Sequence, residues 1–531
     1  MAKTIIKPAG KRLLAFLGVI AVVFGLYYAS QHMPESKPDE NGKTEKSFFG
    51  KMFGGSEKKD YITIGTNTYA GFLYLTWLNN GLEPNEDCIL YKEYGLKAKI
   101  VVQDDFQAGR AAFRNDEIDI LYCTTDALPV EMSEGSDMAD ARYFYLSNWS
   151  RGADAIVANK NIKKVGDLIG KVVACSEGTA SHTLLLNTLE TNGIGYDKVH
   201  MGEGREPNKV NIKVVGSGLD AAAVFKSGEC DAAVVFSPDD QDIVNTMKGR
   251  AWVLVSTKQA SNIICDGLIA KQSYIDKNHD KLETLVSAFL YANSKMNTDE
   301  GAVKQAAQYF AKNYGTDAAF AIDGSKNIYY ATLLDEANFF GLNPEFTGVQ
   351  GSELYSKMAR TYSGLNLCKA PLSWNKVSDS SIIEALLENP SKVKGDQKAE
   401  AKRSFTPATE AVRTANAIST KKVTIEYGTG DYRLSNDAKA LIDTEFIPII
   451  KMFGDARIRI EGNCDATGSD ATNDQLSRLR AQSVCDYICR ELNRDPNQFI
   501  VVGNGSSKAK RDGVQGDNQA YRTTDLEIIT E

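Results

Sequence analysis

The sequence predicts an α/β protein in three parts: an N-terminal membrane helix, a large region of alternating strands and helices, and a smaller C-terminal domain. Three observations support this order. An uncharged run occupies residues 13–29, strand-like and helix-like segments alternate from Tyr61 onward, and a strand-to-helix turn at Asp465 precedes an amphipathic helix. At 531 residues, the chain is long enough for three or more domains.

The uncharged run, Leu13–Ala29, follows a basic tail, residues 1–12, that contains no acid. As a helix it would be about 26 Å long, close to the ~30 Å hydrocarbon core of a bilayer. The basic tail places the N-terminus in the cytoplasm. A cleavable signal peptide is the alternative, but Tyr28 would lie three residues before a cut after Ser30, where a small residue is needed. We expect a retained transmembrane signal anchor with the bulk of the chain exported.

Composition excludes several classes of function. The net charge of −8 and the pI near 5.4 argue against a nucleic-acid partner, which requires a basic face. Four histidines and nine cysteines occur without metal-ligand spacing, and no nucleophile elbow is present. We therefore expect no enzyme activity, no cofactor and no metal site. The odd number of cysteines leaves at least one thiol free.

Two segments have the composition of linkers, residues 30–60 and residues 388–420, both rich in charged and small residues. Between them, residues 61–387 alternate strand and helix patterns, which predicts parallel sheets covered by helices on both faces. Ligands of such sheets bind beyond the carboxyl ends of the strands. This rule selects hydroxyl-bearing residues in four loops as ligand-binding candidates: Thr66, Thr68, Thr124, Thr125, Thr179, Ser181 and Ser237.

The loop before the helix at Ser181 favours an anionic ligand. Backbone amides at Gly178, Thr179 and Ala180 would face outward at a helix N-terminus, where the helix dipole attracts negative charge. Arg151 is the candidate that adds a positive charge. The alternative is that Thr179 or Ser181 only caps its helix, and the two roles are compatible.

Several phrases of this region resemble the periplasmic solute-binding proteins of the nitrate, sulfonate, taurine and thiamine-precursor group. They are Tyr94–Leu96, Arg151–Val157, Val165–Val173 and Gly228–Ala233. The resemblance implies a fold of two lobes that close over a small solute. We expect one lobe at Ala155–Asn245 and the other at Tyr61–Ser147 together with Ala251–Leu387.

Near the C-terminus, Gly462–Gly468 is followed by Asn473, Leu476-Ser477 and Arg480-Ala481. A carboxylate such as Asp465 can receive an ammonium group, and a guanidinium such as Arg480 can hold a carboxylate through two parallel hydrogen bonds. A surface ion pair would be the alternative for a lone Asp and Arg. The order of these residues resembles the OmpA-like family, which binds the diaminopimelate of peptidoglycan.

The resemblance implies an α+β domain at residues 421–531, with peptidoglycan-binding residues Asp465, Asn473 and Arg480. Its opening strand is expected at Val423–Tyr427 and its second strand at Ala456–Glu461. The family usually carries Asn-Arg-Arg before the last strand. Here the corresponding residues are Tyr521-Arg522-Thr523, so one supporting arginine is replaced by threonine.

Together these features predict an inner-membrane, single-pass receptor of the Gram-negative periplasm that binds a small anionic solute and is tethered to peptidoglycan. The alternative is a structural or stator-like subunit that works with a multi-span ion-channel partner. Residues 13–29 contain no acidic residue of the kind ion-driven subunits use, which disfavours that alternative without excluding it. A membrane permease is the partner expected for uptake.

Overall fold

The computed structural model describes residues 59–199, 205–315, 317–427 and 430–529. The chain divides into two compact units, Met1–Lys59 and Asp60–Glu531. The predicted cytoplasmic tail, the predicted membrane helix and nearly all of the first linker lie outside the described residues. Within the described ranges, none of the helices combines the length and apolarity needed to cross a membrane.

Six strands form the first sheet, in the order β12-β4-β11-β3-β1-β2. β1 runs parallel to β2 and β3, whereas β11 runs antiparallel to both β3 and β4. The strands are β1 (Ile62–Thr66), β2 (Ala98–Val102), β3 (Ile120–Thr124), β4 (Ala141–Ser150), β11 (Cys265–Lys271) and β12 (Ile328–Tyr330). This sheet and its helices are called the first lobe.

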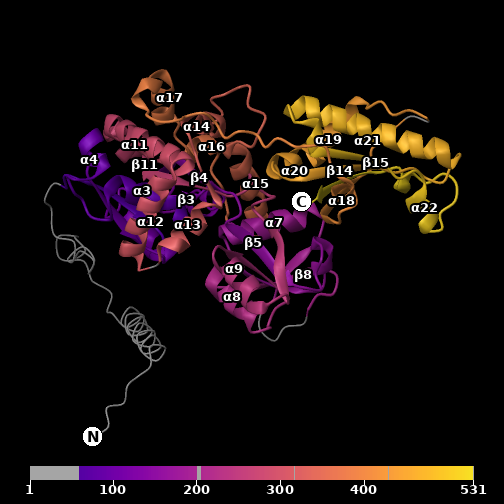
Figure 1. Cartoon of the computed structure of the whole chain (residues 1–531), viewed down its shortest axis with the longest axis horizontal. Helices are drawn as coiled ribbons and strands as arrows, with labels where there is room; N and C mark the ends of the chain where they lie inside the picture. Colours follow the sequence, from indigo (N-terminus) through magenta and orange to yellow (C-terminus); the bar gives the residue numbers. More distant parts are fainter. Residues whose placement is uncertain (1–58, 200–204, 316, 428–429, 530–531) are drawn as a thin grey trace, which may run out of the picture. The chain divides into compact units, whose positions relative to one another are not determined.

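The helices of the first lobe pack on the sheet through large buried aromatic side chains such as Tyr74, Tyr145 and Phe289, whose rings contact one another. Helices α3, α11 and α12 lie together in Figure 1. The helices are η1 (Ala70–Phe72), α3 (Leu73–Asn79), α4 (Ile89–Tyr94), α5 (Phe106–Arg114), α6 (Leu128–Glu131), α10 (Gln272–Lys277), α11 (His279–Thr298), α12 (Glu300–Tyr314), α13 (Ala318–Ser325), α14 (Leu333–Phe339), α15 (Gly351–Gly364), α16 (Trp374–Val377), α17 (Ser381–Glu388) and η3 (Pro390–Lys392).

The second sheet has the order β10-β5-β9-β6-β8-β7 and, with its helices, forms the second lobe. Alternate residues of its strands pack into two cores, as the two-residue period of a strand requires. Ile156 and Val173 pack with helix α7, whereas Val157 and Ala174 pack with α8 and α9. The elements are β5 (Asp154–Asn159), η2 (Val165–Leu168), β6 (Val172–Ser176), α7 (Ala180–Thr191), β7 (Tyr196–Val199), β8 (Val210–Val215), α8 (Gly218–Lys226), β9 (Ala232–Phe236), α9 (Asp239–Met247) and β10 (Ala251–Ser256).

Two sequence-based expectations about these lobes are wrong. The sheets are mixed, because β4, β11 and β12 in the first and β5 and β10 in the second have antiparallel neighbours. The segment Ala251–Ser256, expected in the first lobe, is β10 and pairs with β5 of the second. The chain therefore returns to the first lobe after Ser256, later than the sequence pattern indicated.

The chain passes between the lobes twice, after Ser150 and after Ser256, and one buried threonine holds the two crossings together. The Thr257 Oγ1 atom accepts a hydrogen bond from the Gly152 amide at 3.0 Å and lies 2.7 Å from the Ser150 hydroxyl. The Ser150 hydroxyl in turn donates to Asp154 at 2.8 Å. These short, hydrogen-bonded crossings are the hinge of the two-lobed fold.

A four-stranded sheet of order β13-β16-β14-β15 forms the C-terminal domain, and the long helix α21 covers β14 and β15 (Figure 1). Gly462 allows this close approach, because a Cβ there would lie 2.1 Å from the backbone oxygen of Ser477. The elements are α18 (Glu410–Arg413), β13 (Ala417–Val423), α19 (Asn436–Glu445), α20 (Ile447–Met452), β14 (Arg457–Gly462), α21 (Asp470–Leu492), η4 (Pro496–Gln498), β15 (Phe499–Gly503), α22 (Ser507–Arg511), η5 (Gln519–Tyr521) and β16 (Thr524–Ile529).

The opening strand of this domain lies earlier than expected. It is β13, Ala417–Val423, which pairs with β16, and not Val423–Tyr427. It therefore begins inside the segment 388–420 that composition predicted to be a linker. The second strand differs from its predicted bounds by only one residue.

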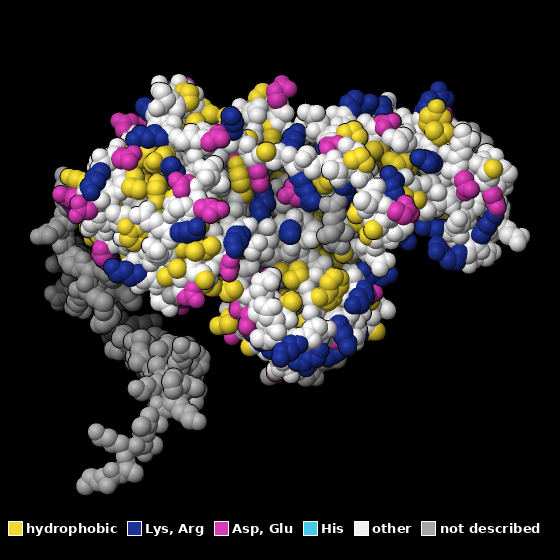
Figure 2. Space-filling view, in the orientation of Figure 1, with side chains coloured by type: hydrophobic (Ala, Val, Ile, Leu, Met, Phe, Trp, Pro, Cys, Tyr) yellow, Lys and Arg dark blue, Asp and Glu magenta, His cyan; other side chains and the backbone are white. Residues whose placement is uncertain are grey.

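The visible face of the molecule carries charged side chains of both signs (Figure 2). All nine cysteines are free thiols, and eight of them are buried. Cys123, Cys175, Cys230 and Cys265, which lie in or next to strands, are among those eight.

Candidate functional site

Asp465 lies in the loop that follows β14, and its carboxylate is almost fully buried. One oxygen, Oδ1, accepts from the Thr467 amide at 3.1 Å. The other, Oδ2, accepts from the Asn518 amide at 3.1 Å and from Nε of Arg522 at 2.8 Å. A carboxylate has about four acceptor positions, so Asp465 can accept a further hydrogen bond on Oδ1.

The pKa of Asp465 is lowered although the group is buried. Burial alone would raise the pKa, but the amides of Asn518 and Thr467 and the guanidinium of Arg522 outweigh that effect. Asp465 is therefore a negatively charged acceptor at any pH near neutrality. A buried, ionised carboxylate is suited to receive an ammonium group.

Arg480 lies on α21 and is also buried. Its Nε donates to the backbone oxygen of Asp431 at 3.1 Å, and its guanidinium lies 4.7 Å from the centre of the Tyr427 ring. One terminal nitrogen lies 3.8 Å from Sγ of Cys464, the neighbour of Asp465 in the chain. The structure thus brings the predicted arginine and aspartate to the same end of β14, without a direct ion pair between them.

Asn473, also predicted to bind ligand, is hydrogen-bonded within the loop that carries Asp465, and its binding role stays a prediction. Its amide nitrogen donates to the backbone oxygen of Thr467 at 2.8 Å and to the Ser506 hydroxyl at 2.8 Å. Because the side chain fixes the turn that carries Asp465, its role in the structure is to position that carboxylate.

The predicted solute-binding loops lie where the sequence placed them, at the carboxyl ends of strands. Thr66 ends β1, Thr124 ends β3, Thr179 and Ser181 follow β6, and Ser237 follows β9. The first two belong to the first lobe and the others to the second. The binding role of these residues stays a prediction.

Most of the hydroxyl groups in these loops make hydrogen bonds within the protein. The Thr68 hydroxyl donates to Asp104 at 2.8 Å, and the Ser237 hydroxyl donates to Asp240 at 3.0 Å. The Thr125 hydroxyl lies 3.1 Å from Sγ of Cys265. They can contact a solute only by sharing or exchanging these partners.

At the start of α7, two of the groups that the sequence suggested for an anion site are hydrogen-bonded within the protein. The Gly178 amide donates to Nδ1 of His182 at 3.3 Å, and the Thr179 hydroxyl donates to the backbone oxygen of Ser176 at 2.9 Å. Burial lowers the pKa of His182 to about 4, so the ring is neutral and can accept this hydrogen bond. Thr179 occupies the N-cap position, but its side chain makes no capping bond.

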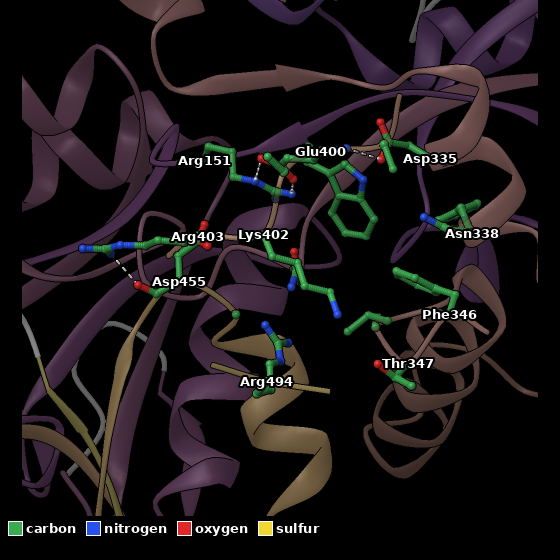
Figure 3. Close-up of a pocket in the computed structure, with 18 residues that line it drawn as sticks. Arg151, Asp335, Asn338, Phe346, Thr347, Glu400, Lys402, Arg403, Asp455 and Arg494 are labelled. Carbon is green, nitrogen blue, oxygen red and sulfur yellow. Dashed lines mark hydrogen bonds and ion pairs between the residues drawn. The ribbon is translucent and has the colours of Figure 1, made fainter. Parts of the chain in front are cut away.

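Arg151 is ion-paired within the protein. Its guanidinium forms a two-point ion pair with Glu400, with Nε to Oε1 at 3.1 Å, and also donates to the backbone oxygen of Ser261. Figure 3 shows this pair at the wall of a cavity of about 200 Å³, whose lining also includes Asp335 and Arg494. The charge of Arg151 is thus matched by Glu400, and its predicted contact with a solute stays a prediction.

A buried contact joins the two lobes close to the predicted loops. Oδ2 of Asp126, from the first lobe, accepts from the hydroxyl of Thr183 on α7 at 2.8 Å. The same hydroxyl lies 2.9 Å from that of Tyr362 on α15, whose ring stacks on His182. Buried polar groups of the two lobes are thus in direct contact.

Comparisons with protein families agree with the division into a two-lobed region and a C-terminal domain. Residues 427–523 match the model described as the OmpA family, and residues 85–311 match the model described as the NMT1-like family. The chain joins an NMT1-like domain to an OmpA domain. A search of curated proteins found no match.

Solved structures similar to the NMT1-like domain include periplasmic sulfonate-binding proteins. The aliphatic sulphonate binding protein SsuA of Escherichia coli is 19% identical, covers 62% of this chain and 100% of its own, and has a TM-score of 0.46. A putative sulfonate-binding SsuA of Methylobacillus flagellatus KT is 15% identical, covers 65% of this chain and 99% of its own, with a TM-score of 0.47. The desulfurization enzyme DSZB is 13% identical, covers 62% of this chain and 100% of its own, with a TM-score of 0.43.

Sequence patterns did not mark one residue of the OmpA domain and three of the NMT1-like domain as candidates. Arg522 is the side-chain partner of Asp465, and its position just before the last strand was the available signal. Asp126, Asp154 and Asp266 are buried near the hinge. Of these, only Asp126 stood in a loop that the strand-end rule selected.

Proposed function

We propose that this protein is a periplasmic solute receptor held to peptidoglycan through its OmpA domain. The observation that carries the proposal is the presence of both domains in one chain, each with its polar residues gathered at strand ends. The proposal contains no catalytic step, although one structurally similar protein is named as an enzyme.

In the OmpA domain, we assign Asp465 to the ammonium group and Arg480 to the carboxylate of the diaminopimelate in the peptidoglycan stem. The free acceptor position on Asp465 Oδ1 and the terminal nitrogens of Arg480 support this assignment, because a zwitterionic group needs one acceptor and one donor side by side. Asn473 and Arg522 position the aspartate.

At the other end of the chain, the uncharged run Leu13–Ala29 would anchor the protein in the inner membrane. The NMT1-like domain would then work in the periplasm between two fixed points. A solute that contacts both lobes favours their closure, because it binds the closed form more tightly than the open form. A permease that accepts the solute is the membrane partner this arrangement would serve.

The receptor function is tested by thermal melting of the purified protein with neutral, anionic and cationic small solutes. A solute present at about 100 times its dissociation constant stabilises the folded state by roughly 2.7 kcal/mol. We therefore expect at least one solute to raise the melting temperature of the NMT1-like domain by several degrees. If no member of a broad panel changes the melting temperature, the domain is not a solute receptor.

A further inference from the structure

Three carboxylates and one amide meet where the two lobes join, and we call Asp126, Asn148, Asp154 and Asp266 the lobe junction. Asp266 on β11 is directly opposite Thr124 at the end of β3 and directly opposite Asn148 on β4. Directly opposed residues of antiparallel strands carry their side chains on the same face. Asp266 and Asn148 therefore share a face with the predicted solute-binding residue Thr124.

The other two carboxylates come from the adjoining loop and from the second lobe. Asp126 lies two residues beyond the end of β3 and contacts Thr183 of the second lobe. Asp154 begins β5 and is opposite Phe236 at the carboxyl end of β9. The lobe junction thus lies at the strand ends of both lobes, which is where such folds bind ligands.

The lobe junction contains no compensating positive charge. Among the described residues, none of the three carboxylates forms an ion pair with a lysine, arginine or histidine, and Arg151 is committed to Glu400. Burial raises the pKa of Asp266 well above its usual value, and the charges of Asp154 and Asp126 raise it further. Burial likewise raises the pKa of Asp154 to about 7. A cationic group would favour the ionised forms of these carboxyls, whereas an anion would disfavour them.

A second observation, independent of the acidic cluster, indicates a missing hydrogen-bond donor. Asn148 is fully buried, and its Oδ1 has no hydrogen-bond partner in the described part of the chain. The orientation of this amide is defined, because Nδ2 donates to the Gly71 oxygen and to the Ser147 hydroxyl. Among the described residues, Oδ1 of Asp126 likewise has no partner with hydrogen-bond geometry. Buried acceptors without donors cost free energy unless a ligand supplies the donors.

We propose that the lobe junction binds an organic cation, whose ammonium or guanidinium N–H groups donate to Asp266, Asp126 and Asn148. This inference rests on the proposed receptor function and specifies its ligand class. It differs from the anionic solute that the sequence suggested. Of the groups behind that expectation, Arg151 is paired with Glu400, and the Gly178 amide and the Thr179 hydroxyl are hydrogen-bonded within the protein.

The test is thermal melting and calorimetric titration of the protein with putrescine, agmatine and arginine, compared with methanesulfonate, sulfate and nitrate. We expect at least one of the cations to raise the melting temperature and the anions to leave it unchanged. Loss of a charge-assisted hydrogen bond weakens binding by roughly 10- to 100-fold. Asp266→Asn and Asp126→Asn should each weaken the affinity for that cation by at least tenfold.

The matched control is Asp323→Asn, which neutralises an exposed carboxylate of the same lobe, paired only with Lys326. This variant should bind as the wild type does. If circular dichroism shows that Asp266→Asn does not fold, the affinity of Asp126→Asn for the cation tests the inference, because Asp126 lies on a loop. Stabilisation by an anion and not by any cation would overturn this inference while leaving the receptor function intact. If none of the six compounds raises the melting temperature, the inference of a cationic ligand is contradicted. If no solute of the broad panel raises it either, the proposed receptor function is contradicted as well.

Discussion

Asp465→Asn and Arg480→Gln are each expected to reduce sedimentation of the protein with purified peptidoglycan at least 30-fold. Both side chains are buried at the same end of β14, and each would hold one charge of the zwitterionic end of diaminopimelate. Truncating one partner of a buried, hydrogen-bonded charge pair costs about 2–5 kcal/mol, because the other charge is left unmatched. The measurement is the fraction of protein that pellets over a range of peptidoglycan concentrations.

The matched control is Arg478→Gln, which removes the same type of charge from an exposed position two residues away on the same helix. It should pellet like the wild type. Circular dichroism of the variants establishes that the OmpA domain remains folded. Wild-type sedimentation of both Asp465→Asn and Arg480→Gln would show that peptidoglycan binds elsewhere or not at all.

Asp154→Asn is expected to stabilise the unliganded protein strongly at pH 8 and much less at pH 5. The pKa of Asp154 is about 7 in the folded protein, compared with a usual value of 3.8, mainly because burial disfavours the charged carboxylate. Between these values the folded state holds the proton that the unfolded state has lost, so the wild type loses stability as pH rises toward 7. The total loss of unfolding free energy is of the order of 4 kcal/mol, and most of this loss occurs above pH 5. Asparagine cannot ionise and avoids this loss.

The measurement is urea unfolding of wild type and Asp154→Asn at both pH values. The exposed Asp323→Asn serves again as the control and should show no pH-dependent difference from wild type. If the difference in unfolding free energy between Asp154→Asn and wild type is the same at pH 5 and pH 8, Asp154 is ionised at both pH values.

Local patterns in the sequence were sufficient to predict much of the architecture. The alternating strands and helices after Tyr61 gave the α/β class, and the turn at Asp465 gave the OmpA domain. Errors occurred where distant segments pair. β10 pairs with β5 across about ninety residues, and β13 pairs with β16 across more than a hundred. The pattern of a single strand does not show which other strand it pairs with. The sequence therefore misassigned the lobe of Ala251–Ser256 and the start of the OmpA domain.

The chemistry of the solute site was less predictable than its location. Thr179 and Ser237 lie at strand ends as expected, but their hydroxyls are used in local hydrogen bonds that only the folded loops reveal. Arg151 looked like a free cation because Glu400 lies far from it in sequence. Asp266 was overlooked, since an acid inside an apolar strand becomes meaningful only when its neighbours across the sheet are known.

The most direct test of this account asks whether one molecule holds a solute and peptidoglycan at the same time. A radiolabelled solute that stabilises the protein is mixed with the protein and purified peptidoglycan, and the mixture is sedimented. We predict that label pellets only when protein is present, in proportion to the pelleted protein, and that Asp465→Asn leaves both in the supernatant. Label that stays in solution while the protein pellets would contradict the union of a solute receptor and a peptidoglycan anchor in this chain.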